Sequence, residues 1–187
     1  MSKTSRLSAV DREAFTSEER ELYESATAGP PHNPTGPTAI WSRSPHLAHA
    51  ALDFGNHIRF HSLLDPRLRE LAVLVTAAHW HSENEWRAHE RLGLAAGLDR
   101  EVIDSIRGEF SSPDAVDRAV HAFVTSLHRE GDVPDEIYAA VADLLGDRGV
   151  VELISTVGFY TMIAMLLNAT RAPLTPPAQP TESEPRT

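Results

Sequence analysis

Glu70, Glu85 and His89 are residues that can carry out acid–base chemistry, and their spacing allows them to meet. Glu70 is flanked by apolar residues, where a carboxylate is costly to bury unless it is paired. An imidazole can gain or lose a proton near neutral pH, and a carboxylate bound to one ring nitrogen fixes its tautomer. We therefore predict a proton-transfer site in which His89 moves the proton, Glu70 orients the imidazole and Glu85 assists.

Each of these residues also has a purely structural interpretation. Glu70 could form an ion pair with Arg67 or Arg69, or with a partner subunit. A single histidine on a helix face is more often a core residue with satisfied ring nitrogens than a catalyst. Glu85 ends a Ser-x-x-Glu capping box that begins at Ser82, in which its carboxylate would bind the backbone at Ser82.

A metal site is a further alternative, because His81, Glu85 and His89 follow a His-x3-Glu-x3-His spacing. On one continuous helix this spacing would align three metal ligands. The capping box at Ser82 argues against a continuous helix, since His81 would then lie before the second helix begins. We therefore predict no metal site.

Two consecutive helices must position these residues. The first is predicted for residues 66–80, where apolar residues recur at helical spacing after Asp65, a typical N-cap. The second is predicted for residues 82–96, followed by Gly97, which is typical just beyond a helix end. A short turn between antiparallel helices would bring the two carboxylates and the imidazole into a shared interior.

Five further polar or aromatic residues could line a substrate pocket. His57 and His61 lie one turn apart on a helix predicted for residues 45–63, before the hairpin. His81 precedes the second hairpin helix and Trp86 lies near its start, while Tyr160 lies on the last predicted helix, which follows Asp147. The histidines and the tyrosine could equally be core or interface residues, and packing is the more usual role for the tryptophan. The predicted substrate-binding residues are His57, His61, His81, Trp86 and Tyr160.

The hairpin resembles the carboxymuconolactone decarboxylase and alkylhydroperoxidase-D-like family. The resemblance spans about residues 39–170 and is carried by RLRELAVL, by EWRAHERLGLAAGL and by the interval of 19 residues from Glu70 to His89. The family places its essential acid–base residues at these two positions. Its redox branch has a Cys-x-x-Cys pair at the positions of Ser82 and Glu85. Because this chain contains no cysteine, thiol peroxidase and disulfide chemistry are excluded.

The resemblance implies an all-α fold of about seven helices built round the antiparallel hairpin, assembled as a dimer, trimer or hexamer. It also implies a cofactor-independent lyase or isomerase that acts on a small carboxylated lactone or enolisable carbonyl compound. The alternative is a non-catalytic, oligomeric protein that binds a small molecule on the same scaffold. The sequence itself agrees with the fold class, since no long stretch alternates at the period of a strand.

Length and composition are those of one globular domain with terminal extensions. We predict a flexible segment at residues 1–15, a single domain at 16–171 and a disordered Pro-rich tail at 172–187; the segment GPPHNPTGP, residues 29–37, is either a lid over a pocket or a plain surface connection. The net charge of −10 argues against nucleic-acid binding. The absence of cysteine and of an apolar N-terminal run indicates a cytoplasmic protein. The apolar stretch 150–169 is expected to be a buried core helix rather than a membrane span.

Overall fold

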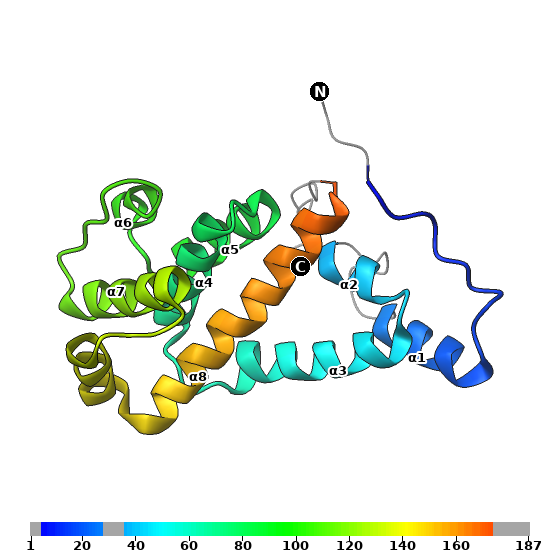
Figure 1. Ribbon diagram of the computed structural model, residues 1–187, viewed down its shortest axis with the longest axis horizontal. Helices are drawn as coiled ribbons and strands as arrows, with labels where there is room; N and C mark the ends of the chain where they lie inside the picture. Colours follow the sequence, from blue (N-terminus) through cyan, green and yellow to red (C-terminus); the bar gives the residue numbers. More distant parts are fainter. Residues whose placement is uncertain (1–4, 28–35, 174–187) are drawn as a thin grey trace, which may run out of the picture.

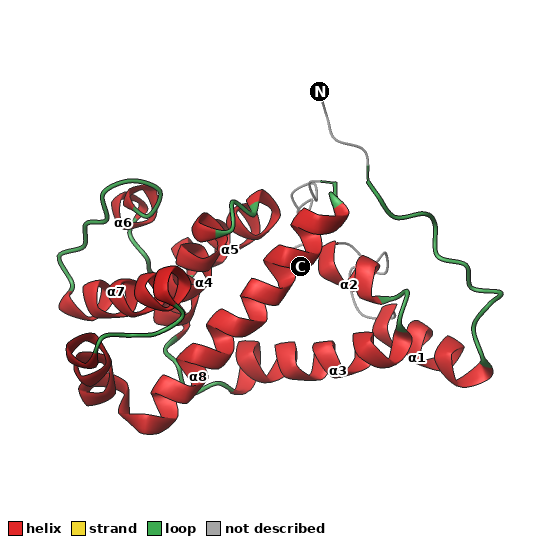
Figure 2. Cartoon of the chain, in the orientation of Figure 1, coloured by secondary structure: helices red, strands yellow, loops and turns green. Residues whose placement is uncertain are grey.

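The computed structural model describes residues 5–27 and 36–173, which form an all-α structure as predicted (Figures 1 and 2). Within these residues there are eight α-helices and one π-helical turn, against about seven predicted helices. Most of the GPPHNPTGP segment and the predicted tail from residue 174 lie outside the described residues. The elements are α1 (Ser17–Thr27), α2 (Gly36–Trp41), α3 (Pro45–Asn56), η1 (His57–His61), α4 (Pro66–His79), α5 (Glu83–Ala95), α6 (Arg100–Ser105), α7 (Ala115–Glu130) and α8 (Asp135–Thr170).

The short helix α2 was not predicted, because its first two residues close a segment rich in proline and glycine. Gly36 takes a left-handed φ of 58°, which glycine adopts without strain. Pro37 follows in the first turn, where its missing N–H removes no intrahelical hydrogen bond. The segment therefore ends in a helix rather than continuing as irregular chain.

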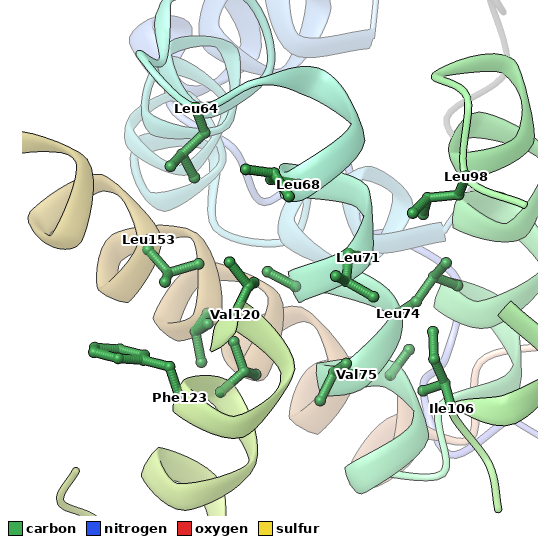
Figure 3. Close-up of a cluster of buried hydrophobic side chains, with 14 of the residues drawn as sticks. Leu64, Leu68, Leu71, Leu74, Val75, Leu98, Ile106, Val120, Phe123 and Leu153 are labelled. Carbon is green, nitrogen blue, oxygen red and sulfur yellow. The ribbon is translucent and has the colours of Figure 1, made fainter. Parts of the chain in front are cut away.

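The central element is α4, which packs against α5, α7 and α8. Every residue from 70 to 77 is buried. Leu71 and Leu74 contribute to a core that also contains Phe123 of α7 and Leu153 of α8 (Figure 3). Each fully buried leucine stabilises the fold by about 1.5–3 kcal/mol relative to an exposed one. Because α4 is covered on several sides, Glu70 is withdrawn from water together with its apolar neighbours.

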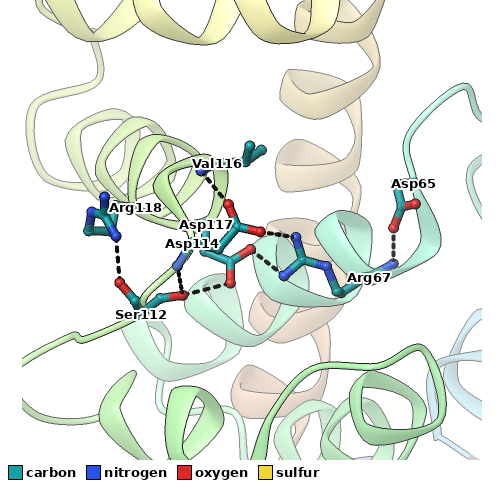
Figure 4. A network of polar contacts seen from close by, with 7 residues as sticks. All are labelled: Asp65, Arg67, Ser112, Asp114, Val116, Asp117 and Arg118. Atoms are coloured by element: carbon teal, nitrogen blue, oxygen red, sulfur yellow. Dashed lines mark hydrogen bonds and ion pairs between the residues drawn. The ribbon is translucent and has the colours of Figure 1, made fainter.

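A polar network joins the start of α4 to α7 (Figure 4). The Arg67 guanidinium donates to Asp117 at 2.6 Å and to Asp114 at 2.9 Å. Asp117 is only 2% exposed, and its other oxygen accepts a hydrogen bond from the Ser112 hydroxyl at 2.8 Å. At the same helix start, Asp65 accepts from the Arg67 backbone N–H at 2.8 Å, which confirms it as the N-cap. A carboxylate as deeply buried as Asp117 needs these partners, so the network fixes α7 against α4.

The long helix α8 lies between α1–α3 and the group formed by α4–α7 (Figure 1). It kinks at Gly146, whose φ of 67° and ψ of 168° are not helical. By length and composition α8 could cross a membrane, but half of its most apolar 18-residue window is buried inside the protein. Leu153, Val157 and Ile163 are among its buried residues. This is the packing of a core helix, as predicted for residues 150–169.

The N-terminal segment is non-helical from residue 5 to residue 16. The Arg6 backbone N–H donates to the carbonyl of Thr170 at 2.9 Å, and its guanidinium donates to the carbonyl of Ala169 at 3.1 Å. Part of the segment that was predicted to be flexible is therefore bound to the C-terminal end of α8.

Candidate active site

The α4–α5 hairpin brings the predicted acid–base residues together. Glu70 lies on α4, while Glu85 and His89 lie one turn apart on α5. His89 Nδ1 is 2.6 Å from Glu70 Oε2, and the two residues are 5% and 4% exposed. An ionised carboxylate can only accept a hydrogen bond, so Nδ1 is the nitrogen that carries the hydrogen. The other ring nitrogen, Nε2, is left to exchange protons.

Glu85 faces that second nitrogen. Its Oε2 lies 3.6 Å from His89 Nε2, which is slightly longer than a hydrogen bond. The capping-box interpretation of this side chain is wrong. Ser82 is the N-cap residue of α5 but makes no side-chain capping bond, and its buried hydroxyl has no hydrogen-bond partner among the described residues. Residues one turn apart share a helix face, so Glu85 points to the same side of α5 as His89 rather than back to the helix start.

Burial raises the pKa of Glu85, and the charges of His89 and Arg59 oppose this shift only in part. Glu85 therefore stays protonated to a higher pH than an exposed glutamate does. The imidazole thus lies between a carboxylate, Glu70, that can hold it and a carboxylic acid, Glu85, that can donate a proton. A buried carboxyl group with a raised pKa beside an imidazole is suited to acid–base catalysis.

The raised pKa of Glu85 leads to a stability prediction. In the folded state the carboxyl group binds its proton more tightly than in the unfolded state, so the free energy of unfolding falls as the pH rises through the window between the two pKa values. Glu85→Gln removes this ionisation. In thermal unfolding, we expect the melting temperature of the variant minus that of the natural protein to become larger from pH 5 to pH 8. Glu101→Gln, at an exposed position, is the control, and a difference for Glu85→Gln that does not grow with pH would contradict the assignment.

Arg69 links Glu70 to the π-helical turn η1. Its Nε and Nη2 each donate to Glu70 Oε1 at 3.3 Å, and its Nη1 donates to the backbone carbonyl of Arg59 at 3.1 Å. An ion pair with Arg69 was one structural alternative for Glu70, and it coexists with the contact to His89. Arg69 therefore balances the charge of Glu70 and holds η1 beside α4.

Tyr160 of α8 packs against the imidazole. Its ring meets the His89 ring nearly edge-on, with centroids 4.7 Å apart and an interplanar angle of 82°. Burial raises the pKa of the Tyr160 hydroxyl, and the adjacent Arg59 guanidinium opposes this shift in part. The hydroxyl therefore stays neutral at physiological pH and can act as a hydrogen-bond donor.

The acid–base residues and Tyr160 line a cavity of about 640 Å³, a size that suits a small organic molecule. Among the described residues, four arginines line its wall, and Arg59 forms no ion pair with any of these described residues. Gly36 and Pro37 also line the cavity, so the described end of the GPPHNPTGP segment reaches it. The charged lining residues are Arg59, Arg69, Arg87, Arg91, Glu70, Glu85 and Glu90, and the larger apolar ones are Phe60, Leu92 and Ile163.

Three predicted substrate-binding residues lie on other faces of their helices. His57 Nε2 lies 3.3 Å from Oε1 of Glu152 on α8, within hydrogen-bond distance, and His61 is exposed. Trp86 is 6% exposed and forms part of the core, with the Arg107 guanidinium 3.8 Å from its ring centroid. None of the three lines the cavity, and of the five predicted residues Tyr160 alone does so.

The fourth misplaced residue, His81, lies in the turn between α4 and α5 with a left-handed φ of 49°. It faces a separate cavity, so it is not aligned with Glu85 and His89. The His-x3-Glu-x3-His spacing therefore does not assemble a ligand set. Within residues 5–27 and 36–173, no group of three or more His, Asp or Glu side chains is placed to hold a metal ion.

Sequence reasoning missed Arg59 and Phe60, which reach the cavity from η1. A π-helical turn holds more residues than an α-helical turn, so it rotates the following side chains away from the positions that an α-helical pattern assigns. The available signal was the run HIRFH, residues 57–61, which concentrates basic and aromatic residues at a helix end.

Comparison with protein families assigns residues 45–125 to the carboxymuconolactone decarboxylase family. The matched segment runs from α3 into α7 and contains Glu70, Glu85 and His89. Residues 45–125 are therefore similar in sequence to this family. The matched segment, like the rest of the chain, contains no cysteine, as expected for a cysteine-free relative of this family. No curated protein matches the chain.

Three solved structures share the fold of this chain. An uncharacterised peroxidase-related protein from Silicibacter sp. TM1040 is 15% identical with a TM-score of 0.74, over 91% of this chain and 92% of its own. A protein from Agrobacterium tumefaciens, described as an AhpD-type antioxidant defence protein of unknown function, is 16% identical with a TM-score of 0.65, over 72% and 94%. The debrominase Bmp8, as a cysteine-to-alanine variant bound to 2,3,4-tribromopyrrole, is 12% identical with a TM-score of 0.68, over 92% and 94%. The TM-scores show a common fold, and at identities this low the similarity is limited to the fold.

Proposed function

We propose that the protein is a cofactor-independent lyase or isomerase that uses Glu70, His89 and Glu85 for acid–base chemistry on a small carboxylated lactone or enolisable carbonyl compound. The observation that carries the proposal is the buried imidazole, held at Nδ1 by Glu70 at 2.6 Å and facing the carboxyl group of Glu85 with Nε2. The family assignment supports the same class of substrate. The ligand of the debrominase of similar fold, a bromopyrrole, is also a small ring.

In the proposed reaction, Arg59 binds the substrate carboxylate that is retained, because its guanidinium lines the cavity without an ion-pair partner among the described residues. When a second carboxylate leaves as CO₂, its C–C bond breaks and the electron pair moves onto the oxygen of a conjugated carbonyl group. The Tyr160 hydroxyl donates a hydrogen bond to this enolate oxygen. The His89 imidazolium then protonates carbon, and Glu85 returns a proton to Nε2. An isomerisation would use the same proton transfers without loss of CO₂.

The direct test is to incubate the purified protein with a carboxylated muconolactone in D₂O and follow CO₂ release and deuterium incorporation. We expect at least one of the two, with no added metal or cofactor and no dithiol-dependent peroxidase turnover. Binding without either reaction would favour the alternative, a non-catalytic protein that holds a small anionic molecule in the same cavity. The cysteine-free composition also fits the reducing cytoplasm, where we propose that the protein works.

We also propose that the chain forms a homo-oligomer through the outer face of α8. Val151, Ile154, Met162 and Met165 recur at helical spacing on this face and are 62%, 41%, 37% and 49% exposed. A contiguous apolar stripe of this kind is typical of an interface.

Sedimentation of the 20.5 kDa chain at micromolar concentration should therefore give a dimer or a larger assembly. Ile154→Asp introduces a charge into the stripe and should shift the association equilibrium toward the monomer. A protein that sediments as a monomer without this substitution would contradict the proposal.

A further inference from the structure

A second cavity, of about 520 Å³, lies between the end of α4, the α4–α5 turn and α7. Among the described residues it shares no lining residue with the candidate active site. Its polar wall contains four of the ten histidines of the chain together with two arginines and one glutamate. These charged and titratable residues are His79, His81, His121, His128, Arg107, Arg129 and Glu83.

The fixed charges of this cavity favour an anion, although the chain as a whole carries a net charge of −10. The only carboxylate among the described residues of the wall, Glu83, is already paired with Arg107 at 2.9 Å and with Arg87 at 3.1 Å. Arg129 is exposed and forms no ion pair with any described residue. Arg129 lines the same cavity as His79 and His121, and its charge contributes to lowering the pKa of both.

Hydrogen bonding fixes the proton position on the neutral form of His128. The Thr76 hydroxyl donates to the carbonyl of Ala72 at 2.8 Å, so it can only accept from His128 Nε2, which lies 3.0 Å away. In the neutral ring the hydrogen is therefore on Nε2, and Nδ1 carries a lone pair. A lone pair repels an anion, so His128 can donate to one only when Nδ1 is also protonated.

The surroundings of His128 oppose its protonation. Burial and the nearby His79 lower the pKa of His128 to about 4. The two rings are stacked, with centroids 4.5 Å apart and an interplanar angle of 11°. The pKa of His79 is also lowered, mainly by burial. An anion beside these rings would compensate the repulsion between two imidazolium groups and make proton uptake more favourable.

We propose that this cavity is a binding site for the oxyanion group of a small molecule, a phosphate or a carboxylate, and that binding is coupled to protonation of His128. Arg129 supplies the permanent positive charge, and the His128 imidazolium supplies a hydrogen bond from Nδ1. Affinity should therefore rise as the pH falls, by up to about tenfold per pH unit while one proton is taken up.

The test uses sulfate, because it remains a dianion across the pH range in which histidines titrate. Isothermal titration with sodium sulfate, against sodium chloride of equal ionic strength, should give saturable binding of one sulfate per chain, up to about 100-fold tighter at pH 6 than at pH 8. In ¹⁵N NMR at pH 6, added sulfate should move the His128 Nδ1 resonance toward that of a protonated nitrogen. Titration with phosphate and with succinate then distinguishes the two classes of natural ligand.

Matched variants locate the site. Arg129→Gln should weaken sulfate binding at least tenfold, and His128→Gln, which keeps a donor for Thr76, should remove most of the pH dependence. Arg148→Gln and His61→Gln change exposed residues outside this cavity and should have no effect. The proposal would be overturned if all four variants bound sulfate equally or if the affinity did not rise at lower pH. Saturable zinc binding that competes with sulfate would also overturn it.

Discussion

Replacing His89 by glutamine should lower kcat/KM by about 10²–10⁴-fold on any substrate that the candidate active site turns over, which is the usual contribution of a general acid–base group. The buried ring is held at Nδ1 by Glu70 and faces Glu85 with Nε2, so no other described histidine can take its place. Glutamine fills a similar volume and keeps hydrogen-bonding capacity, but it cannot carry a proton at physiological pH.

A double-mutant cycle with Glu70→Gln shows whether the two residues act as a unit. Glu70→Gln keeps the shape of the side chain and removes the charge that supports the imidazolium. Once either residue has been replaced, the second substitution should cost little more, so that the double variant resembles the His89→Gln protein. Loss of the full sum of the two single effects would show that the residues act independently.

The pair formed by His57 and Glu152 provides a matched control for that cycle. It also joins an imidazole to a carboxylate, at 3.3 Å, but neither residue lines the cavity. His57→Gln and Glu152→Gln should therefore leave kcat/KM within about twofold of the natural protein. A large loss of activity in these variants would indicate that substitutions of this type disturb the fold as a whole.

The largest stability effect is expected for Arg67→Gln, which should lower the free energy of unfolding by about 3 kcal/mol. The substitution leaves Asp117, 2% exposed, without its cationic partner. This loss is at the lower end of the range expected for breaking a buried ion pair, because the Arg67 side chain is 26% exposed and water reaches it. Chemical denaturation followed by circular dichroism measures the change.

Two further variants define the origin of that loss. Adding Asp117→Asn to Arg67→Gln removes the stranded charge and should restore part of the stability. Arg87→Gln breaks an exposed pair with Glu83 and should change stability by no more than about 0.5 kcal/mol. An equal loss for Arg67→Gln and Arg87→Gln would contradict the account of the network in Figure 4.

The hairpin could be predicted from the sequence because its signals are local. Asp65 is the N-cap of α4, and Gly97, with a φ of 93°, follows α5. These signals place Glu70 and His89 on neighbouring helices, and the interval of 19 residues then lets them meet. The sequence alone was therefore sufficient to predict that Glu70 and His89 share one interior.

The direction of individual side chains was less predictable, because packing decides it. Glu85 carries a strong local capping signal, yet it faces His89. Trp86, the next residue, points to the core, and His81 points to the second cavity because the turn gives it a left-handed conformation. Arg59 reaches the active-site cavity from a π-helical turn, which has no distinct pattern in the sequence.

The proton position on the His89 ring tests the central claim most directly and needs no substrate. In ¹⁵N–¹H correlation spectra of the imidazole at pH 7, Nδ1 of His89 should carry a hydrogen, because Glu70 Oε2 accepts from it. Glu70→Gln should weaken this preference, whereas Glu152→Gln should not. If His89 instead carries its hydrogen on Nε2 alone, with Nδ1 unprotonated and no change in Glu70→Gln, the two residues do not form an acid–base pair and the proposed function fails.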